Sequence, residues 1–181
     1  MGMILRYDDR AMNTYDILGV EIDDISDIKL KQLLLQWLNG KGGAKIVTPN
    51  PEIILEARDN HEFKKLLNES DLSVPDGIGL SYATVALHSH SLECRHTGVD
   101  VFLLLMQLCA EQEKRVLLMG GNPGSAAKSA RVLKKVFPAL CIEGFDPGRI
   151  HGNAGHIIIP DDVLSQIQAS KPDTIVVGLG A

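Results

Sequence analysis

The chain has 181 residues, of which 45% are hydrophobic and only 4% aromatic, and it carries a formal net charge of −5. This length supports one well-formed core, and the shortage of aromatic side chains predicts an aliphatic core of the α/β type. The mild negative charge, without a Lys/Arg stripe, argues against nucleic acid as a partner, and no segment resembles a transmembrane helix or signal peptide.

Short apolar runs alternate with helical patterns in the first half of the chain. A strand is expected at 15–22, followed by an acidic turn at Asp23-Asp24, which we interpret as solvated, like Asp8-Asp9. The remaining elements predicted here are a helix from 26 or 27 to 38, a strand at 44–47, a helix beginning at Pro51, a helical segment at 63–67 and a short strand that ends at Pro75.

The second half has a more regular pattern. It predicts helices at 99–110, 125–137 and 161–169, strands at 115–119, 140–145 and 174–177, and a loop at 146–160. Residues 115–145 then form a βαβ unit, in which parallel strands are joined by a helix. The predicted fold is a Rossmann-like open, mostly parallel sheet with flanking helices, in one lobe or two.

The most informative motif is Val74-Pro75-Asp76-Gly77. Pro75 ends a strand because it has no N–H for a ladder, and Gly77 permits tight backbone geometry before the next helix. Asp76 therefore lies at the carboxyl end of a strand, where open α/β folds bind ligands. The simplest alternative is that Asp76 is only the N-cap of that helix.

A similar turn lies upstream, at Thr48-Pro49-Asn50-Pro51. If strands 44–47 and 71–74 are adjacent and parallel, a hydroxyl, an amide and a carboxylate meet at one edge of the sheet. These groups are able to orient a sugar hydroxyl and remove its proton. Thr48 and Asn50 are also ordinary turn formers and helix caps, so that alternative stays open.

Arg95 precedes the apolar helix at 99–110, where a cation opposes the helix dipole. The mismatch predicts an anionic partner, such as Asp76 or a substrate diphosphate. Thr97 and Asp100 suit the start of the same helix and have capping as their alternative role.

A glycine-rich loop, Gly120-Gly121-Asn122-Pro123-Gly124, follows the strand at 115–119 and opens the next helix. Such loops present unpaired N–H groups and the positive end of the helix dipole, which suits a phosphate group. The spacing matches neither GxGxxG nor the P-loop pattern, so a tight turn without a ligand is the alternative.

Metal-binding patterns are weak. His88-x-His90 resembles half of a zinc motif, but no third ligand follows at a recognisable spacing, and we expect surface histidines rather than a metal site. The three cysteines, Cys94, Cys109 and Cys141, show no CxxC spacing and are expected to be reduced thiols. Cys94 lies beside Arg95 but has no positioned base, which argues against a nucleophile.

Four motifs in order carry a resemblance to a known family. These are Thr48-Pro49-Asn50-Pro51-Glu52 with Ala57-Arg58, the stretch 71–79 around Asp76, Arg95-His96-Thr97-Gly98-Val99-Asp100, and the glycine loop with Leu118-Met119 before it. Over residues 15–181 the chain resembles the bacterial WecG/TagA/CpsF glycosyltransferase family.

The resemblance implies an inverting, metal-independent enzyme without cofactors, which moves an N-acetylhexosamine-type sugar from a UDP donor to a polyprenyl-diphosphate-linked sugar. Its general base falls on Asp76, and its substrate-binding residues fall on Thr48, Asn50, Arg95 and Asp100. Its donor-nucleotide residues fall on Gly120, Gly121, Asn122, Gly124, Gly178 and Gly180. The acceptor lobe then covers 14–110 and the donor half 114–181, within a single glycosyltransferase domain at 1–181.

Family members usually continue past residue 181 into a basic segment thought to help cover the site and dock on the membrane. The resemblance therefore implies a cytoplasmic enzyme, peripheral to the inner face of the membrane, whose tail is missing here. We also expect self-association, because the stop at Ala181 exposes the last strand's usual packing partners.

Two other functions remain open. A nucleotide-dependent oxidoreductase would use the same glycine loop with an acidic ribose-binding residue, for which Glu143 and Asp146 lie near the right distance. An inactive nucleotide-sugar binding module is the second alternative.

Overall fold

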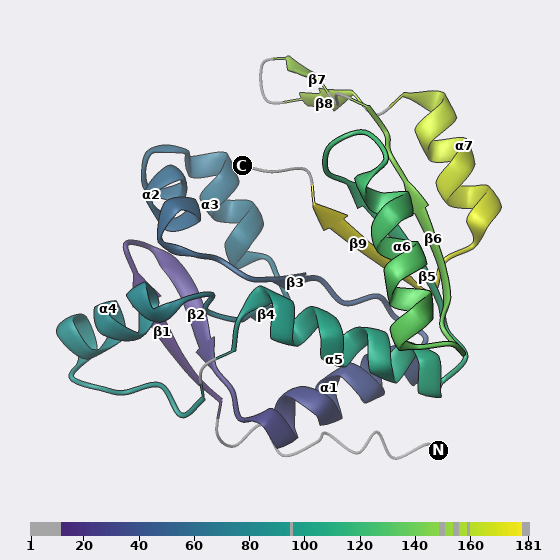
Figure 1. Cartoon of the computed structure of the whole chain (residues 1–181). Helices are drawn as coiled ribbons and strands as arrows, with labels where there is room; N and C mark the ends of the chain where they lie inside the picture. The colour runs from purple at the N-terminus through teal and green to yellow at the C-terminus, as the bar shows by residue number, and fades with distance from the viewer. Residues whose placement is uncertain (1–11, 95, 149–150, 154–155, 159, 179–181) are drawn as a thin grey trace, which may run out of the picture. The chain divides into compact units, whose positions relative to one another are not determined.

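The computed structural model describes residues 12–94, 96–148, 151–153, 156–158 and 160–178 (Figure 1). The chain divides into two compact units, one made of residues 1–32 and 43–100 and the other of residues 33–42 and 101–181. Helices alternate with short sheets, and the largest sheet is parallel, so the predicted α/β class is confirmed. The predicted acceptor and donor functions of the two halves stay predictions.

The first unit begins with a hairpin where we expected one strand at 15–22. Strands β1 (Asn13–Ile17) and β2 (Val20–Asp24) pair antiparallel, joined by Leu18 and Gly19. Both connecting residues have positive φ, 56° and 86°, as a two-residue turn requires to match the twist of the strands. The single strand was wrong because Leu18 adopts a conformation that its side chain disfavours, which the sequence pattern does not reveal.

The acidic pair at the end of β2 is also not a solvated turn. Asp24 is only 6% exposed, and its carboxylate accepts the Glu93 N–H at 2.7 Å. Asp23 accepts the Ser73 N–H at 2.8 Å, which joins β2 to strand β4 (Leu72–Ser73). These carboxylates hold neighbouring backbone segments in place, whereas Asp8-Asp9 lie outside the described residues.

The other elements of the first unit follow the predicted order. They are β3 (Ile46–Val47), α2 (Pro51–Asp59), α3 (His61–Asn68) and α4 (Ile78–His88). Helices α1 (Asp27–Asn39) and α5 (Gly98–Glu111) each contribute residues to both units. The core of the first unit is aliphatic, as expected, and contains Ile17, Val20, Ile22, Ile54, Ala57, Leu67 and Leu80.

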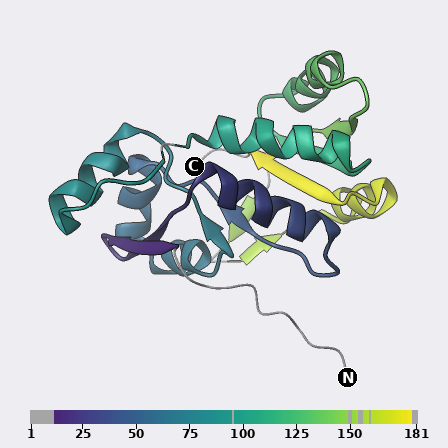
Figure 2. The same cartoon turned by 90° about the horizontal axis from the view of Figure 1, so that it is seen from below.

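The second unit is built on a parallel sheet with the order β6-β5-β9. Its strands are β5 (Arg115–Gly120), β6 (Cys141–Phe145) and β9 (Thr174–Gly178), and the last is an edge strand, drawn as the yellow arrow in Figure 2. Helices α6 (Ser125–Val136) and α7 (Asp161–Ser170) complete the predicted pattern. The βαβ unit at 115–145 is confirmed, with β5 and β6 paired in parallel.

Close packing of α6 on the sheet depends on Gly144 in β6. A Cβ at this position would overlap the backbone of Ala126, so only glycine lets the helix approach the strand this closely. The predicted loop at 146–160 instead contains a hairpin of β7 (His151–Asn153) and β8 (His156–Ile158). Across the described ranges, no helix combines the length and the apolar character needed to cross a membrane.

Candidate functional site

Two turns of the first unit lie side by side at the ends of β3 and β4. The strands pair in parallel, with Val47 opposite Ser73. Beyond the strands, the Asp76 N–H donates to the Pro49 carbonyl oxygen at 2.8 Å. The predicted adjacency of the Thr48 turn and the Asp76 junction is therefore confirmed, because parallel strands bring their carboxyl ends to one edge.

The side chain of Asp76 does not cap the helix that follows it. The N-cap of α4 is Gly77, with φ 91° and no side-chain hydrogen bond, so the capping alternative is wrong. Instead, Asp76 and Thr48 face the space beside Gly98. A Cβ at Gly98 would lie 3.2 Å from Asp76 Oδ2 and 3.0 Å from Thr48 Oγ1, which places both oxygens around one spot.

Asn50 has the structural role that we left open for it. Its side-chain oxygen accepts the Ile53 N–H at 2.9 Å and caps α2, whose first residue is Pro51. The side-chain NH₂ of Asn50 is the group that remains for a ligand.

Thr97 and Asp100 form a capping box at the start of α5. Asp100 Oδ2 accepts both the Thr97 hydroxyl, at 2.7 Å, and the Thr97 N–H, at 2.9 Å, while the Asp100 N–H points back to Thr97 Oγ1 at 3.2 Å. The bond from the Thr97 hydroxyl, with that from its N–H, lowers the pKa of Asp100. This carboxylate oxygen is therefore occupied by capping, and Arg95 lies outside the described residues.

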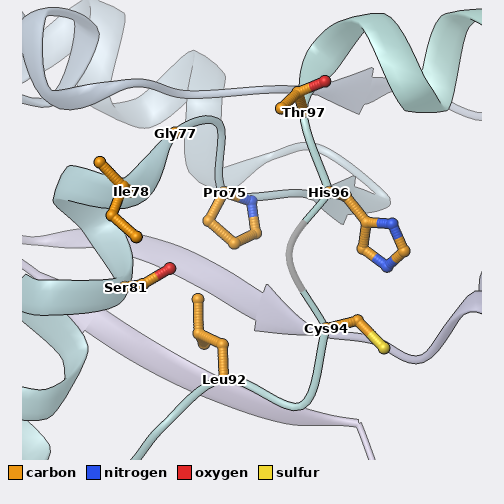
Figure 3. Close-up of a pocket in the computed structure, with 8 residues that line it drawn as sticks. All are labelled: Pro75, Gly77, Ile78, Ser81, Leu92, Cys94, His96 and Thr97. Atoms are coloured by element: carbon orange, nitrogen blue, oxygen red, sulfur yellow. The ribbon is translucent and has the colours of Figure 1, made fainter.

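A small cavity of about 30 Å³ lies beside the turn at Pro75-Asp76-Gly77 (Figure 3). Its lining includes Pro75 and Gly77 on either side of Asp76, together with Cys94, His96 and Thr97 from the segment that leads into α5. A cavity of this volume is large enough to hold at least one water molecule.

The glycine loop of the second unit has the geometry that its sequence predicts. Gly120, Gly121 and Gly124 all have positive φ, between 80° and 106°, which side chains disfavour. The loop borders an open cavity of about 240 Å³, slightly below the roughly 300–1,000 Å³ of most small-molecule sites. Its lining includes Gly120, Gly121, Ser125 and Gly178, whereas Gly180 lies outside the described residues.

Two N–H groups of this loop already have partners within the protein. The Gly121 N–H donates to the Gly178 carbonyl oxygen at 2.7 Å, and the Gly124 N–H donates to Asp146 Oδ2 at 2.5 Å. The expectation of unpaired N–H groups was therefore wrong for these two residues. These bonds instead fasten the loop to the last residue of β9 and to the residue that follows β6.

Asp146 is one of the two candidates for the ribose-binding carboxylate that an oxidoreductase would need. Its Oδ2 holds the glycine loop, whereas its Oδ1 is buried and has no hydrogen-bond partner among the described residues. A buried acceptor without a partner is costly unless a ligand or water donates to it. Glu143 is exposed on β6 and shows no comparable arrangement in the described part of the chain.

The histidines of the partial zinc motif have other partners. His88 Nε2 lies 2.7 Å from the Asp16 carbonyl oxygen, and His90 Nε2 lies 3.4 Å from the buried carboxylate of Asp24. Both rings contact Tyr15. The predicted surface position fits His88, which is exposed, while His90 is half-buried. His96 is buried at 7% exposure, and its Nε2 lies 2.9 Å from the Ile25 carbonyl oxygen.

Sequence reasoning missed one cluster. The ligand atoms of Asp27, Cys94 and His96 all lie within 4.8 Å of one another. The available signal was the spacing Cys94-x-His96, but the third member comes from the start of α1, so spacing along the chain does not reveal it.

The family model for the glycosyl transferase WecG/TagA/CpsF family matches residues 15–181. A Bacillus spizizenii protein named N-acetylglucosaminyldiphosphoundecaprenol N-acetyl-beta-D-mannosaminyltransferase is 30% identical over 171 residues, 94% of this chain and 62% of the relative. Proteins of the same name are 28% identical in Bacillus subtilis, over 80% of this chain and 53% of the relative, and 25% identical in Staphylococcus aureus, over 91% and 63%.

The chain thus spans between about half and two thirds of the length of these relatives. The family match nevertheless covers nearly all of the described residues, including both turns of the first unit and the glycine loop of the second. The chain belongs to the glycosyl transferase WecG/TagA/CpsF family.

Proposed function

We propose that this protein is an inverting glycosyltransferase with Asp76 as its general base. It would move N-acetylmannosamine, or a related N-acetylhexosamine, from a UDP donor to a polyprenyl-diphosphate-linked GlcNAc, as the names of its relatives suggest for donor sugar and acceptor. The reaction belongs to cell-surface polysaccharide assembly at the inner face of the membrane, by a peripheral enzyme that self-associates. The observation that carries the proposal is the meeting of Asp76 and Thr48 beside Gly98.

Asp76 is suited to act as a base because its carboxylate does not cap α4. Thr48 Oγ1 borders the same spot and would hold the acceptor hydroxyl, while Asp76 takes its proton. The resulting oxygen nucleophile attacks the anomeric carbon from the face opposite UDP, the new glycosidic bond forms, and UDP departs with the electrons of the broken bond. Attack from the opposite face inverts the anomeric configuration.

The glycine loop and its cavity would receive the nucleotide. The start of α6 supplies the positive end of a helix dipole, and its first residue, Ser125, lines the cavity. Asp146 Oδ1, buried and without a partner among the described residues, is an acceptor for a ribose hydroxyl. We assign the stabilisation of the departing diphosphate to these dipoles, with no metal ion in the transfer step.

Substitution of Asp76 by asparagine tests the assignment of the base. We expect Asp76→Asn to lose about 10²- to 10⁴-fold in transfer from UDP-N-acetylmannosamine to a soluble lipid-diphosphate-GlcNAc analogue, with UDP binding retained. Both this chain and a fusion carrying the unmatched segment of the Bacillus spizizenii relative would be assayed.

A matched control is Asp71→Asn, at the amino end of β4, whereas Asp76 lies beyond the carboxyl end. Asp71 accepts the Lys45 N–H at 2.7 Å, and asparagine keeps an acceptor there, so transfer should persist. Normal transfer by Asp76→Asn would overturn the base assignment. Absence of UDP binding in both forms of the protein would overturn the donor site.

A further inference from the structure

The side chain of His96 is oriented in a way that leaves one nitrogen without a hydrogen. The Ile25 carbonyl oxygen can only accept a hydrogen bond, so Nε2, at 2.9 Å from it, carries the proton. In the neutral ring Nδ1 then has a lone pair. The ring is buried, with only 6% of its side chain exposed, so bulk water has little access to it.

This lone pair faces a second acceptor. His96 Nδ1 lies 3.5 Å from Asp27 Oδ1. Two acceptors at this distance repel each other unless a proton or a cation lies between them. The arrangement also matches a recurrent feature of metal sites, in which a ligating histidine donates its other N–H to a backbone carbonyl.

Cys94 supplies a third ligand atom at the same place. Its Sγ, the Asp27 carboxylate and His96 Nδ1 belong to the cluster in which all ligand atoms lie within 4.8 Å of one another. Figure 3 shows the Cys94 and His96 side chains on the same side of the chain segment that leads into α5. Asp27 is 83% exposed on its side chain, so it is able to rotate toward an ion.

We propose that Asp27, Cys94 and His96 bind a divalent transition metal of the zinc type. One sulfur, one imidazole nitrogen and one carboxylate oxygen form a ligand set that suits zinc, rather than magnesium or calcium, which prefer oxygen alone. Zinc holds such ligands at about 2.0–2.3 Å, which places them roughly 3–4 Å apart, within the 4.8 Å found here. Water would occupy the fourth position.

The ion would fasten the segment before α5 to the start of α1. His96 and Ile25 are 71 positions apart in the sequence, and the segment from Ser89 to Thr97 contains no helix or strand among its described residues. This segment ends at Thr97 and is followed by Gly98, which lies beside Asp76. The site has a structural role in this proposal and is independent of the sugar-transfer reaction proposed above.

Cobalt and zinc binding to the 181-residue chain test this site. We expect one Co²⁺ per chain, with the near-ultraviolet absorption of a cobalt–thiolate bond, and a higher Tm with zinc. Cys94→Ser should abolish that absorption and weaken zinc binding at least tenfold. Cys141→Ser, which alters an exposed thiol on β6, is the matched control and should leave both unchanged.

The variant Asp27→Asn distinguishes an effect on zinc binding from an effect on the stability of the metal-free protein. The asparagine amide is able to donate to His96 Nδ1, so the metal-free variant should unfold at the wild-type temperature while its zinc affinity falls about tenfold. The proposal fails if the wild-type chain binds neither ion. It also fails if Cys94→Ser and Asp27→Asn both bind zinc as the wild type does.

Discussion

The side chains of Thr48 and Asp76 are able to share one small space because Gly98 has no Cβ. An alanine methyl there would lie 3.0 Å from the threonine hydroxyl and 3.2 Å from the carboxylate, distances that force one of them to move by a few tenths of an ångström. Catalytic geometry is sensitive to such shifts, because displacements near 1 Å cost about 100-fold in rate. At the residue scale, Gly98 is therefore a positioning residue.

We predict that Gly98→Ala lowers the turnover of the proposed transfer on the order of tenfold, with a smaller effect on UDP binding. Steady-state kinetics would separate the fall in kcat from any change in KM. Gly42→Ala is the control, since a Cβ at Gly42 has no atom within 4 Å in the described part of the chain. Full turnover in Gly98→Ala would show that Asp76 and Thr48 do not act together at this position.

At the scale of elements, the ends of the helices account for most polar residues of the predicted site. Asn50 caps α2, and Thr97 with Asp100 caps α5, so these side chains support helix starts whatever else they bind. Asp76 differs, because the N-cap of α4 is Gly77 and the helix has no side-chain cap. Among these residues, Asp76 is the carboxylate left available for chemistry.

The capping box predicts a pH-dependent contribution to stability. Replacing Thr97 by alanine removes one cap and should lower the free energy of unfolding by about 1 kcal/mol at pH 7. Since its hydrogen bonds from Thr97 lower the pKa of Asp100, their contribution is present above the ordinary carboxyl pKa and is lost as the pH falls through the lowered value.

Urea denaturation of the wild type and Thr97→Ala at pH 7 and at acidic pH measures this effect. The difference between the two proteins should shrink on acidification, and Thr97→Ser, which keeps the hydroxyl, should behave as the wild type. Equal stabilities at pH 7 would show that the capping box contributes nothing.

At the scale of the whole molecule, the glycosyltransferase proposal and the oxidoreductase alternative differ in the ligand that each requires, a sugar nucleotide or a dinucleotide. A ligand that binds only the folded state stabilises it by about 2.7 kcal/mol at 100 times its Kd, so thermal unfolding reports binding without any assay of turnover. We predict that UDP raises the Tm and that NAD does not. The reverse result would favour the oxidoreductase alternative, with Asp146 as the ribose-binding residue.

The variant Gly178→Val tests whether UDP binds in the cavity of the second unit. Gly178 lines the cavity of the second unit, and a Cβ there meets no atom of the described residues within 4 Å, so valine should occupy part of the cavity without straining the fold. We expect this variant to keep its Tm without ligand and to lose the shift caused by UDP. Gly43→Val, which also adds an unobstructed side chain, should keep that shift.

Periodicity and turn chemistry along the chain were enough to predict most elements of both units. The helix starts at Pro51 and Ser125 and the βαβ order at 115–145 follow from local signals, namely proline, glycine and apolar spacing. The β1–β2 hairpin was not predictable in this way, because its turn places Leu18 at positive φ. The β7–β8 hairpin was hidden in a stretch whose glycines and histidines resemble a loop.

The sequence by itself determined the α/β class, the glycine loop and the candidacy of Asp76, because each depends on residues close together in the chain. Only the tertiary structure decided that Asp76 meets Thr48 at Gly98, that Asn50 and Asp100 serve as caps, and which atoms hold the loop. It also brought Asp27 to His96 across most of the first unit's length. The physical reason is that strand register and helix packing set distances between side chains remote in sequence, which local propensity does not encode.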